Sequence, residues 1–406
     1  MADDPNTRGG ERPSRRTADF ANKPLPDVPP SKPLQWFLLA AFLVTGAAYL
    51  AGEWAQKASH ARSVQAGNLR RMVRAQNDYL SHIKAGDEAL ANKHPDQAVA
   101  EYRLALQTTN TAAGRHALGQ ALLKQNNPAE AFIEFAEALK LEPELAAAAN
   151  DWGLALAAQG NLEESARVLR AALEHNPHSG LLNCDLAGAL VQMRAAAEVR
   201  RRTAENAGKT QDATTAATEA EGFSSQALEH FNAAIQDKFD SPVFWSAYGQ
   251  LLNELGRGAE AEAPLLRSVS EDANAGAAQF QLALAEDHLG KYAEAIDHYE
   301  KVLALAPNDP AALNNLALLY ATATNTEVRT AKMAVQLATR ACDATSGQNA
   351  RYMDTLARSY AAGGDFFQAI TWEDKATQRA MQLNDQAQVR EFQQRQSLLM
   401  DHRTGE

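Results

Sequence analysis

Residues 118–143 read LGQALLKQNNPAEAFIEFAEALKLEP, and residues 282–307 read LALAEDHLGKYAEAIDHYEKVLALAP. Each stretch predicts a helix, a short turn, a second helix and a closing proline. The short turns fall at Asn126–Asn127 and at Gly290. A proline just beyond the second helix cannot continue it. The chain therefore repeats a two-helix unit.

The unit returns at an interval of about 34 residues, as the spacing of Gly119 and Gly153 illustrates. In this register, copies begin near residues 79, 112, 146, 180, 242, 276, 310 and 350. One helix pair cannot bury its apolar face alone, so neighbouring pairs must stack. The sequence predicts an all-α, right-handed solenoid of about eight helix pairs over residues 79–383. A capping helix and tail are expected at 384–406.

The composition agrees with an all-helical chain. Alanine supplies 83 of the 406 residues, and Ala, Leu, Glu and Gln favour helix over sheet. Small residues such as Gly119 and Ala131 allow paired helices to approach closely, and large ones such as Tyr102 and Phe135 fill the space between them. The two cysteines are too few for a disulfide scaffold or a four-cysteine zinc module.

The fourth copy carries an insertion of about 28 residues, at 194–221, with basic residues at Arg194 and Arg200–Arg202. We expect the insertion to lengthen both helices of its pair into a protruding hairpin. Two interpretations stay open. The hairpin is either a docking spur for a partner or lipid surface, or a tolerated loop insertion.

The N-terminal region predicts a disordered tail and one membrane helix. Residues 1–33 are rich in proline and arginine and too poor in apolar residues to form a core. Residues 34–52, LQWFLLAAFLVTGAAYLAG, contain no charge over 19 positions, which roughly matches a 30 Å hydrocarbon layer. Trp36 and Trp54 lie near the two ends, where aromatic rings favour the headgroup region. We predict a single-pass anchor, with a cleaved signal peptide as the alternative.

Residues 53–78 predict a basic helical stalk. Arg70, Arg71 and Arg74 either contact anionic lipid headgroups or form a solvated basic face. Residues 1–78 carry a net charge of +4, and residues 79–406 carry a net charge of −15. The numbers of basic residues on the two sides of the span are nearly equal, so the positive-inside rule does not decide its orientation. We expect the tail in the cytoplasm and the repeats outside it, which in a bacterium means the periplasm; the opposite orientation stays open.

Neither composition nor motifs predict catalysis. The net charge of −11 disfavours nucleic-acid binding, which requires a basic surface. No P-loop, GxGxxG, HExxH, GxSxG or DxDxDG motif occurs. We therefore predict no enzyme activity, no cofactor and no metal site.

The spacing, the residue sizes and the exit prolines together resemble the tetratricopeptide repeat (TPR) family. The last repeats, NNLALLYAT and YMDTLARSYAAGGDFFQAI, resemble the ends of many bacterial membrane-anchored members. In this family, ligands usually lie in a concave groove lined by the first helix of each repeat. By register, the resemblance implies that the groove residues are His116, Gln120, Lys124, Asn150, Gln250, Asn253, Asn314, Arg351, Asp354 and Arg358.

These features together predict a membrane-anchored TPR scaffold that binds other proteins in a membrane or envelope complex. The alternative is a cytoplasm-facing adaptor that regulates the assembly or turnover of a membrane enzyme. Neither the partner nor the oligomeric state follows from the sequence.

Overall fold

A computed structural model describes residues 55–323 and 330–404. The chain divides into two compact units, residues 1–75 and 76–406. Of the first unit, the described part is the start of one long helix. The described residues form seventeen helices and contain no strand, which confirms the predicted all-helical, TPR-like solenoid.

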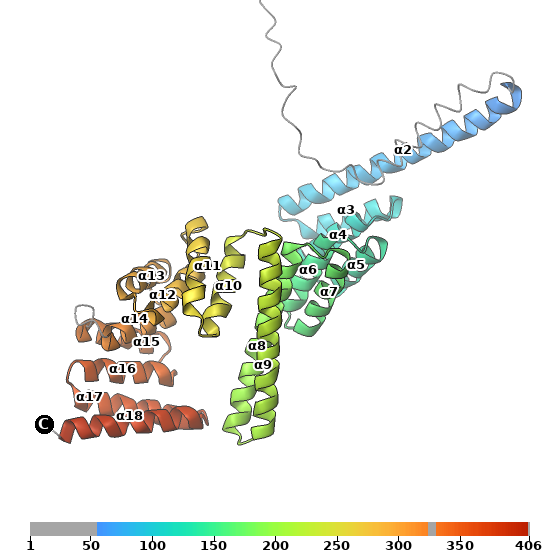
Figure 1. The fold of residues 1–406 in the computed structure, drawn as a ribbon. Coiled ribbons are helices and arrows are strands. Elements are labelled where there is room, and N and C mark those ends of the chain that lie inside the picture. Colours follow the sequence, from blue (N-terminus) through green and yellow to red (C-terminus); the bar gives the residue numbers. More distant parts are fainter. Residues whose placement is uncertain (1–54, 324–329, 405–406) are drawn as a thin grey trace, which may run out of the picture. The chain divides into compact units, whose positions relative to one another are not determined.

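Each repeat contributes two helices, and Figure 1 labels them in chain order. They are α2 (Ala55–Ala91), α3 (Pro95–Thr108), α4 (Ala112–Lys124), α5 (Pro128–Leu141), α6 (Ala146–Ala158), α7 (Leu162–His175), α8 (Gly180–Asn206), α9 (Thr210–Gln236), α10 (Pro242–Glu254), α11 (Gly258–Glu271), α12 (Gly276–His288), α13 (Tyr292–Leu305), α14 (Pro310–Thr322), α15 (Ala331–Ala344), α16 (Ala350–Ala362), α17 (Phe366–Gln382) and α18 (Gln386–Thr404).

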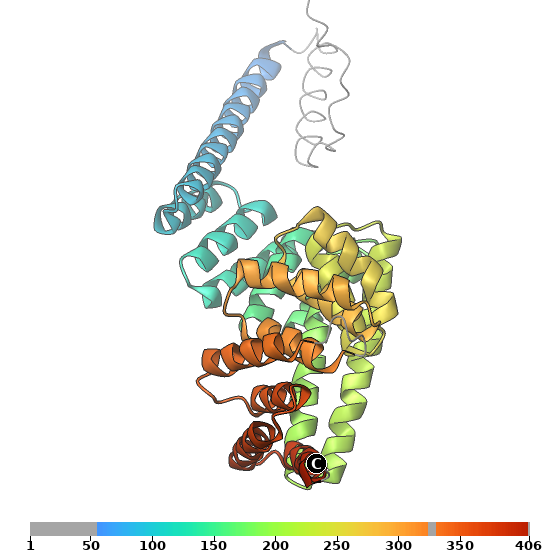
Figure 2. The same ribbon diagram turned by 90° about the vertical axis from the view of Figure 1, so that its left-hand side faces the viewer.

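Within the second unit, helices pair and stack in sequence order. α4 packs on α5, α10 on α11 and α16 on α17, and each pair also contacts the next (Figures 1 and 2). We number the pairs as repeats 1 to 8, from α2/α3 to α16/α17. α18 follows as a single helix, and its Phe392 is almost fully buried in the core of the last repeats.

Local signals explain where the helices begin and end. Asp309 accepts a hydrogen bond from the backbone N–H of Ala312 at 2.7 Å, which satisfies one of the free donors at the start of α14. Proline opens α3, α5, α10 and α14, where its missing N–H costs nothing. Between paired helices the backbone is left-handed, with φ of 63° at Asn126 and 75° at Gly290. These are the turns at which the sequence places Asn and Gly.

The paired helices touch where a glycine faces a large side chain. A Cβ on Gly119 would lie 2.5 Å from the ring of Phe135, closer than real contacts allow. Gly153 meets Leu169 in the same way, with a Cβ distance of 2.8 Å. Phe135 and Leu169 are almost fully buried. The backbone can therefore come this close only because glycine has no side chain.

In repeat 4 the two helices are each 27 residues long, about twice the usual length in this chain. They form an antiparallel hairpin that runs beyond the neighbouring helices (Figure 1). Small buried residues line the contact between them: Ala197, Ala204, Ala213, Ala216 and Ala220. Arg200 Nη2 lies 2.8 Å from Glu219 Oε2 across the same pair.

The predicted transmembrane helix at 34–52, with Trp36 and Trp54, lies outside the described residues. No helix within 55–323 and 330–404 is long and apolar enough to cross a membrane. Arg70, Arg71 and Arg74 lie on α2 and are exposed.

We predict that Gly119→Ala destabilises the chain by about 1–3 kcal/mol, because the added methyl group must displace Phe135 or part the two helices. The measurement is urea unfolding of the full chain in mild detergent, followed by helical circular dichroism.

The matched control is Gly188→Ala. Gly188 also lies inside a helix, but a Cβ there meets no atom within 4 Å. We expect this variant to be neutral or more stable by up to about 1 kcal/mol, since alanine is the better helix former. Equal losses in both variants would show that the close approach is not the constraint.

Candidate protein-binding groove

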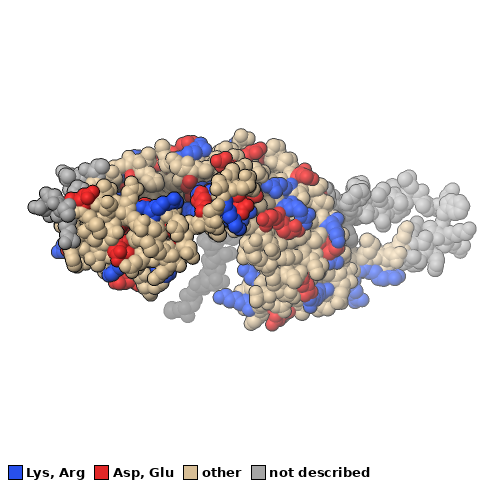
Figure 3. Space-filling view, turned by 90° about the horizontal axis from the view of Figure 1, so that it is seen from below, with Lys and Arg blue, Asp and Glu red and all other residues tan. Residues whose placement is uncertain are grey.

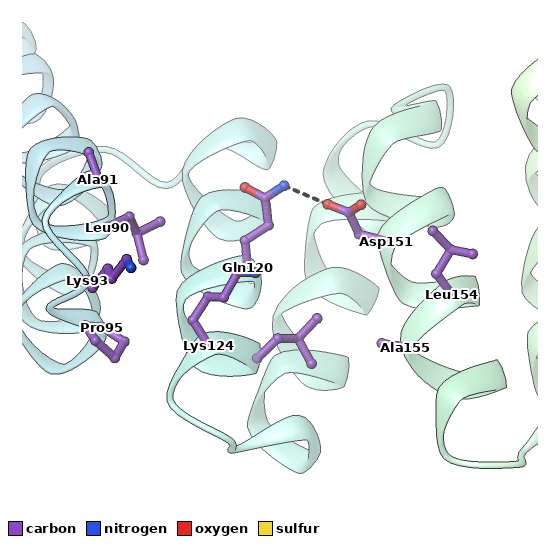
Figure 4. A pocket seen from close by; sticks show the side chains of 10 residues that line it. Leu90, Ala91, Lys93, Pro95, Gln120, Lys124, Asp151, Leu154 and Ala155 are labelled. Atoms are coloured by element: carbon purple, nitrogen blue, oxygen red, sulfur yellow. Dashed lines mark hydrogen bonds between the residues drawn. The ribbon is translucent and has the colours of Figure 1, made fainter. Parts of the chain in front are cut away.

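A hollow of about 960 Å³ extends across the first three repeats. Figure 4 shows side chains reaching it from the end of α2 and the following turn, from the start of α3, from α4 and from α6. It is lined by Leu90, Ala91, Lys93, Pro95, Gln120, Leu123, Lys124, Asp151, Leu154 and Ala155. Three successive repeats thus contribute to one surface, which we call the groove.

A hydrogen-bonded cluster lies along the groove. Nε2 of Gln120 donates to Asp151 Oδ2 at 2.6 Å, and Nε2 of His116 lies 2.7 Å from the same oxygen. Burial raises the pKa of Asp151, but the bonds from His116 and Gln120 outweigh it, and the net pKa is below its usual value. Asp151 therefore stays ionised, and hydrogen bonds from His116 and Gln120 stabilise its negative charge.

The remaining lining is apolar and basic. Leu90, Leu123 and Leu154 come from three different repeats. Lys93 and Lys124 form no ion pair within the described part of the chain. The groove thus offers apolar contact area beside two ammonium groups, in a repeat region whose net charge is strongly negative.

Four of the ten residues predicted by register gather here. Gln120 and Lys124 line the groove, and His116 joins them through Asp151. Asn150 is adjacent, with Nδ2 3.5 Å from Asp151 Oδ1. Asp151 is not among the residues predicted by register. The available signal was its position about one repeat after His116 and Gln120.

Two other predicted groove residues are buried. Asn253 is 6% exposed and donates from Nδ2 to the backbone oxygen of Gln281 at 2.7 Å. Asn314 is 8% exposed and donates to Asn315 Oδ1 at 3.2 Å. Asn253 therefore joins its repeat to the next one, and neither amide is presented to a ligand.

Gln250 and Arg351 lie apart from the groove. Gln250 donates to Glu254 Oε1 one turn further along α10, at 2.8 Å. Arg351 lies in the first turn of α16 and lines a separate small hollow.

Asp354 and Arg358 belong to a buried network in the last repeat. Asp354, 7% exposed, accepts a hydrogen bond from Arg395 of α18 and lies 4.0 Å from Arg358. Glu373 of α17 has no exposed surface, and its Oε1 lies 3.6 Å from Arg395 Nη1. Burial raises the pKa of both carboxyl groups, and Arg395 opposes the rise. This network fastens α18 to repeat 8 and is not part of the groove.

Glu373 takes the place of a large apolar residue. It follows Ala357 at the same separation at which Phe135 follows Gly119 and Tyr299 follows Ala283. Phe135 and Tyr299 fill their repeats from this position. The register therefore puts an ionisable group inside the last repeat.

The described residues hold no cluster of metal ligands, and the face drawn in Figure 3 has no large area of one charge. No group of three or more His, Cys, Asp or Glu that could hold an ion is found among them. Cys184 and Cys342 are free thiols. Figure 3 shows basic and acidic side chains interspersed on the face seen from below, with no large area of one sign.

Two stretches match models of the repeat family. Residues 116–180 match the model described as Tetratricopeptide repeat, and residues 288–323 match the one described as TPR repeat. The first stretch contains most of the groove. These two stretches of the helical solenoid are similar to TPR proteins, which generally mediate protein–protein interaction and are typically non-catalytic.

Parts of this chain are similar to solved structures of low sequence identity. Pseudomonas aeruginosa pilF is 23% identical, with 62% of this chain and 98% of that chain covered and a TM-score of 0.44. Thermus thermophilus TTC0263 is 19% identical, covering 58% and 100%, with a TM-score of 0.37. YrrB, a TPR protein with an unusual peptide-binding site, is 17% identical, covering 52% and 92%, with a TM-score of 0.40. These likenesses say nothing about function. A search of the curated proteins gives no match.

We predict that Glu373→Gln reduces the pH dependence of stability. The pKa of Glu373 is raised above 4.5, so the folded chain holds a proton that the unfolded chain releases. The stability linked to that proton is complete below about pH 4.5 and is lost as pH rises through the raised pKa. Between about pH 6 and pH 9, the unfolding free energy of wild type should fall by about 1 kcal/mol more than that of the variant.

Glu391→Gln is the control, because Glu391 also pairs with Arg395, at 3.1 Å, but is exposed. Its pH profile should follow wild type. Parallel profiles for wild type and Glu373→Gln in urea titrations would contradict the assignment.

Proposed function

We propose that this chain is a non-catalytic, membrane-anchored scaffold that holds other proteins in a membrane or envelope complex. In this proposal, the groove of repeats 1 to 3 binds a segment of a partner protein. The observation that carries the proposal is the groove itself, in which three repeats present apolar side chains and two lysines that form no ion pair with the described residues.

The chemistry of the groove favours a partner segment with apolar and acidic residues. Leu90, Leu123 and Leu154 supply apolar surface, whose burial drives association. Lys93 and Lys124 attract carboxylates. Asp151 is already hydrogen-bonded by His116 and Gln120, so it repels such a segment less than a free carboxylate does.

The anchor proposal is supported by sequence and by one exposed surface. The uncharged run at 34–52 has the length of a single span, and Trp36 and Trp54 lie at its ends. Arg70, Arg71 and Arg74 are exposed on α2, where they are free to meet anionic headgroups. Anchoring would raise the local concentration of the groove at the bilayer.

We predict that Leu154→Asp combined with Lys124→Glu abolishes partner recovery. The pair removes apolar contact area and inverts one charge inside the groove. The full chain, purified in mild detergent by affinity, should retain a stoichiometric partner, and the variant should lose at least about tenfold of it.

Ile133→Asp is the matched control. Ile133 is 61% exposed on α5 and Leu154 is 47% exposed on α6, but only Leu154 lines the groove. The control should recover the partner as wild type does. Equal recovery with the groove variant, or no stoichiometric partner with wild type, would contradict the proposal.

We predict that deleting residues 1–52 moves the chain from the membrane fraction to the soluble fraction of cells, because the proposed span is lost.

We also propose that the repeats lie on the periplasmic side. Protease added to intact spheroplasts should then digest them.

Protection of the repeats in intact spheroplasts, with digestion after lysis, would favour the cytoplasm-facing adaptor instead. Recovery of the intact full chain in the soluble fraction would contradict the anchor.

A further inference from the structure

The long hairpin of repeat 4 is firmly held at its base. Arg194 of α8 lies 2.5 Å from Glu254 Oε2 of α10, and Arg194 is largely buried. Arg170 of α7 donates to Gln226 of α9 at 2.9 Å. The hairpin therefore leaves the stack in a direction fixed by the repeats on both sides.

The tip of the hairpin lies across a hollow from the last repeat and α18. A hollow of about 270 Å³ is lined by both, and its lining residues are Arg201, Arg202, Glu205, Asn206, Arg351, Asp385, Ala387, Gln388 and Glu391. The first four belong to α8, and the others to α16, to α18 and to the turn before it. No residue of α10–α15 lines this hollow. Figures 1 and 2 both place the start of α18 beside the tip.

Both sides carry charges of both signs, but α8 has an excess of positive charge (Arg201, Arg202 and Glu205) and the other side an excess of negative charge (Arg351, Asp385 and Glu391). Arg202 forms no ion pair within the described residues, and it faces a side that carries Asp385 and Glu391, of which Glu391 also pairs with Arg395. Arg201 is held in place by Glu198 and Glu205, at 2.8 and 2.5 Å. Figure 3, viewed from the side on which the tip lies in Figure 1, shows both signs of charge interspersed on this face.

We propose that the hairpin is an intramolecular clasp, in which its tip at 201–206 docks on repeat 8 and the start of α18. The chain between the two, repeats 5 to 7, is then held at both ends. An open solenoid changes its curvature by small rotations between neighbouring repeats. A solenoid held by the clasp cannot change its curvature unless the tip is released. A partner whose binding to repeats 5 to 7 requires a change of curvature must therefore open the clasp first. This inference is independent of the groove in repeats 1 to 3.

The test is cross-linking within one chain. Asn206→Cys and Ala387→Cys place one thiol on each side of the hollow. Burial raises the pKa of the native thiols, Cys184 to about 12 and Cys342 to about 11, so both react slowly near neutral pH. A short bismaleimide added to the full chain in mild detergent should join the new pair, detected as a linked peptide by mass spectrometry.

The control pair is Gln192→Cys with Ala387→Cys. Gln192 is exposed on the same helix as Asn206 but lies about 21 Å away along it. The tip pair should link about tenfold faster than the control pair. Equal rates, or a linkage only between two chains, would overturn the clasp.

Charge variants test the clasp in a second way, which does not depend on whether the introduced cysteines disturb the tip. Arg202→Glu should slow linkage of the tip pair about twofold to fivefold, because it faces Asp385 and Glu391 with a like charge. Adding Glu391→Arg should restore the rate. If Arg202→Glu leaves the rate unchanged, the tip is not held there by charge, and the proposal fails.

Discussion

The close approach of a glycine or alanine to a large side chain, within each helix pair, is the contact on which the rest of the fold depends. In four repeats a Cβ on the glycine would lie only 2.4–2.8 Å from the side chain that covers it. The four contacts are Gly86 with Tyr102, Gly119 with Phe135, Gly153 with Leu169 and Gly249 with Leu265. The separation in sequence between the two partners is the same in all four pairs. This shared separation places the close contact at the equivalent position in each of the four pairs.

The same position explains the behaviour of the C-terminal repeat. With Glu373 where other repeats carry an aromatic or leucine side chain, the core must accommodate a carboxyl group, and Arg395 of α18 reaches in toward it. A buried ion network contributes little net stability but is costly to break when one partner is lost. Elsewhere burial raises the pKa of Asp185 and Glu286 to about 7. The repeats are thus less negative near neutral pH than their composition indicates.

Much of the fold could be predicted from the sequence because it depends on local signals. Proline at the first helical position, Asn or Gly in the turn and alternating small and large residues act within one repeat, and all of them are visible in the text of residues 118–143. The groove could be predicted only in part. The register shows that a residue lies on the first helix of its repeat, but not whether a neighbouring helix covers it. For this reason Asn253 and Asn314 are predicted in the groove, although both are buried. Asp151 was missed because its role arises from the neighbouring repeat.

The hairpin also brings together segments that are far apart in the sequence. Along the stack, contacting side chains come from the same repeat or from repeats close in sequence, as with Arg194 and Glu254. The hollow at the tip is lined by Arg202 of repeat 4 and Gln388 of α18, which have repeats 5 to 8 between them in the sequence. Folding rates fall as contacts join more distant segments, because the intervening chain must be ordered first. The proposed clasp is thus a junction of high contact order in a protein otherwise assembled from local units, and it can form only after the repeats between its two sides have folded.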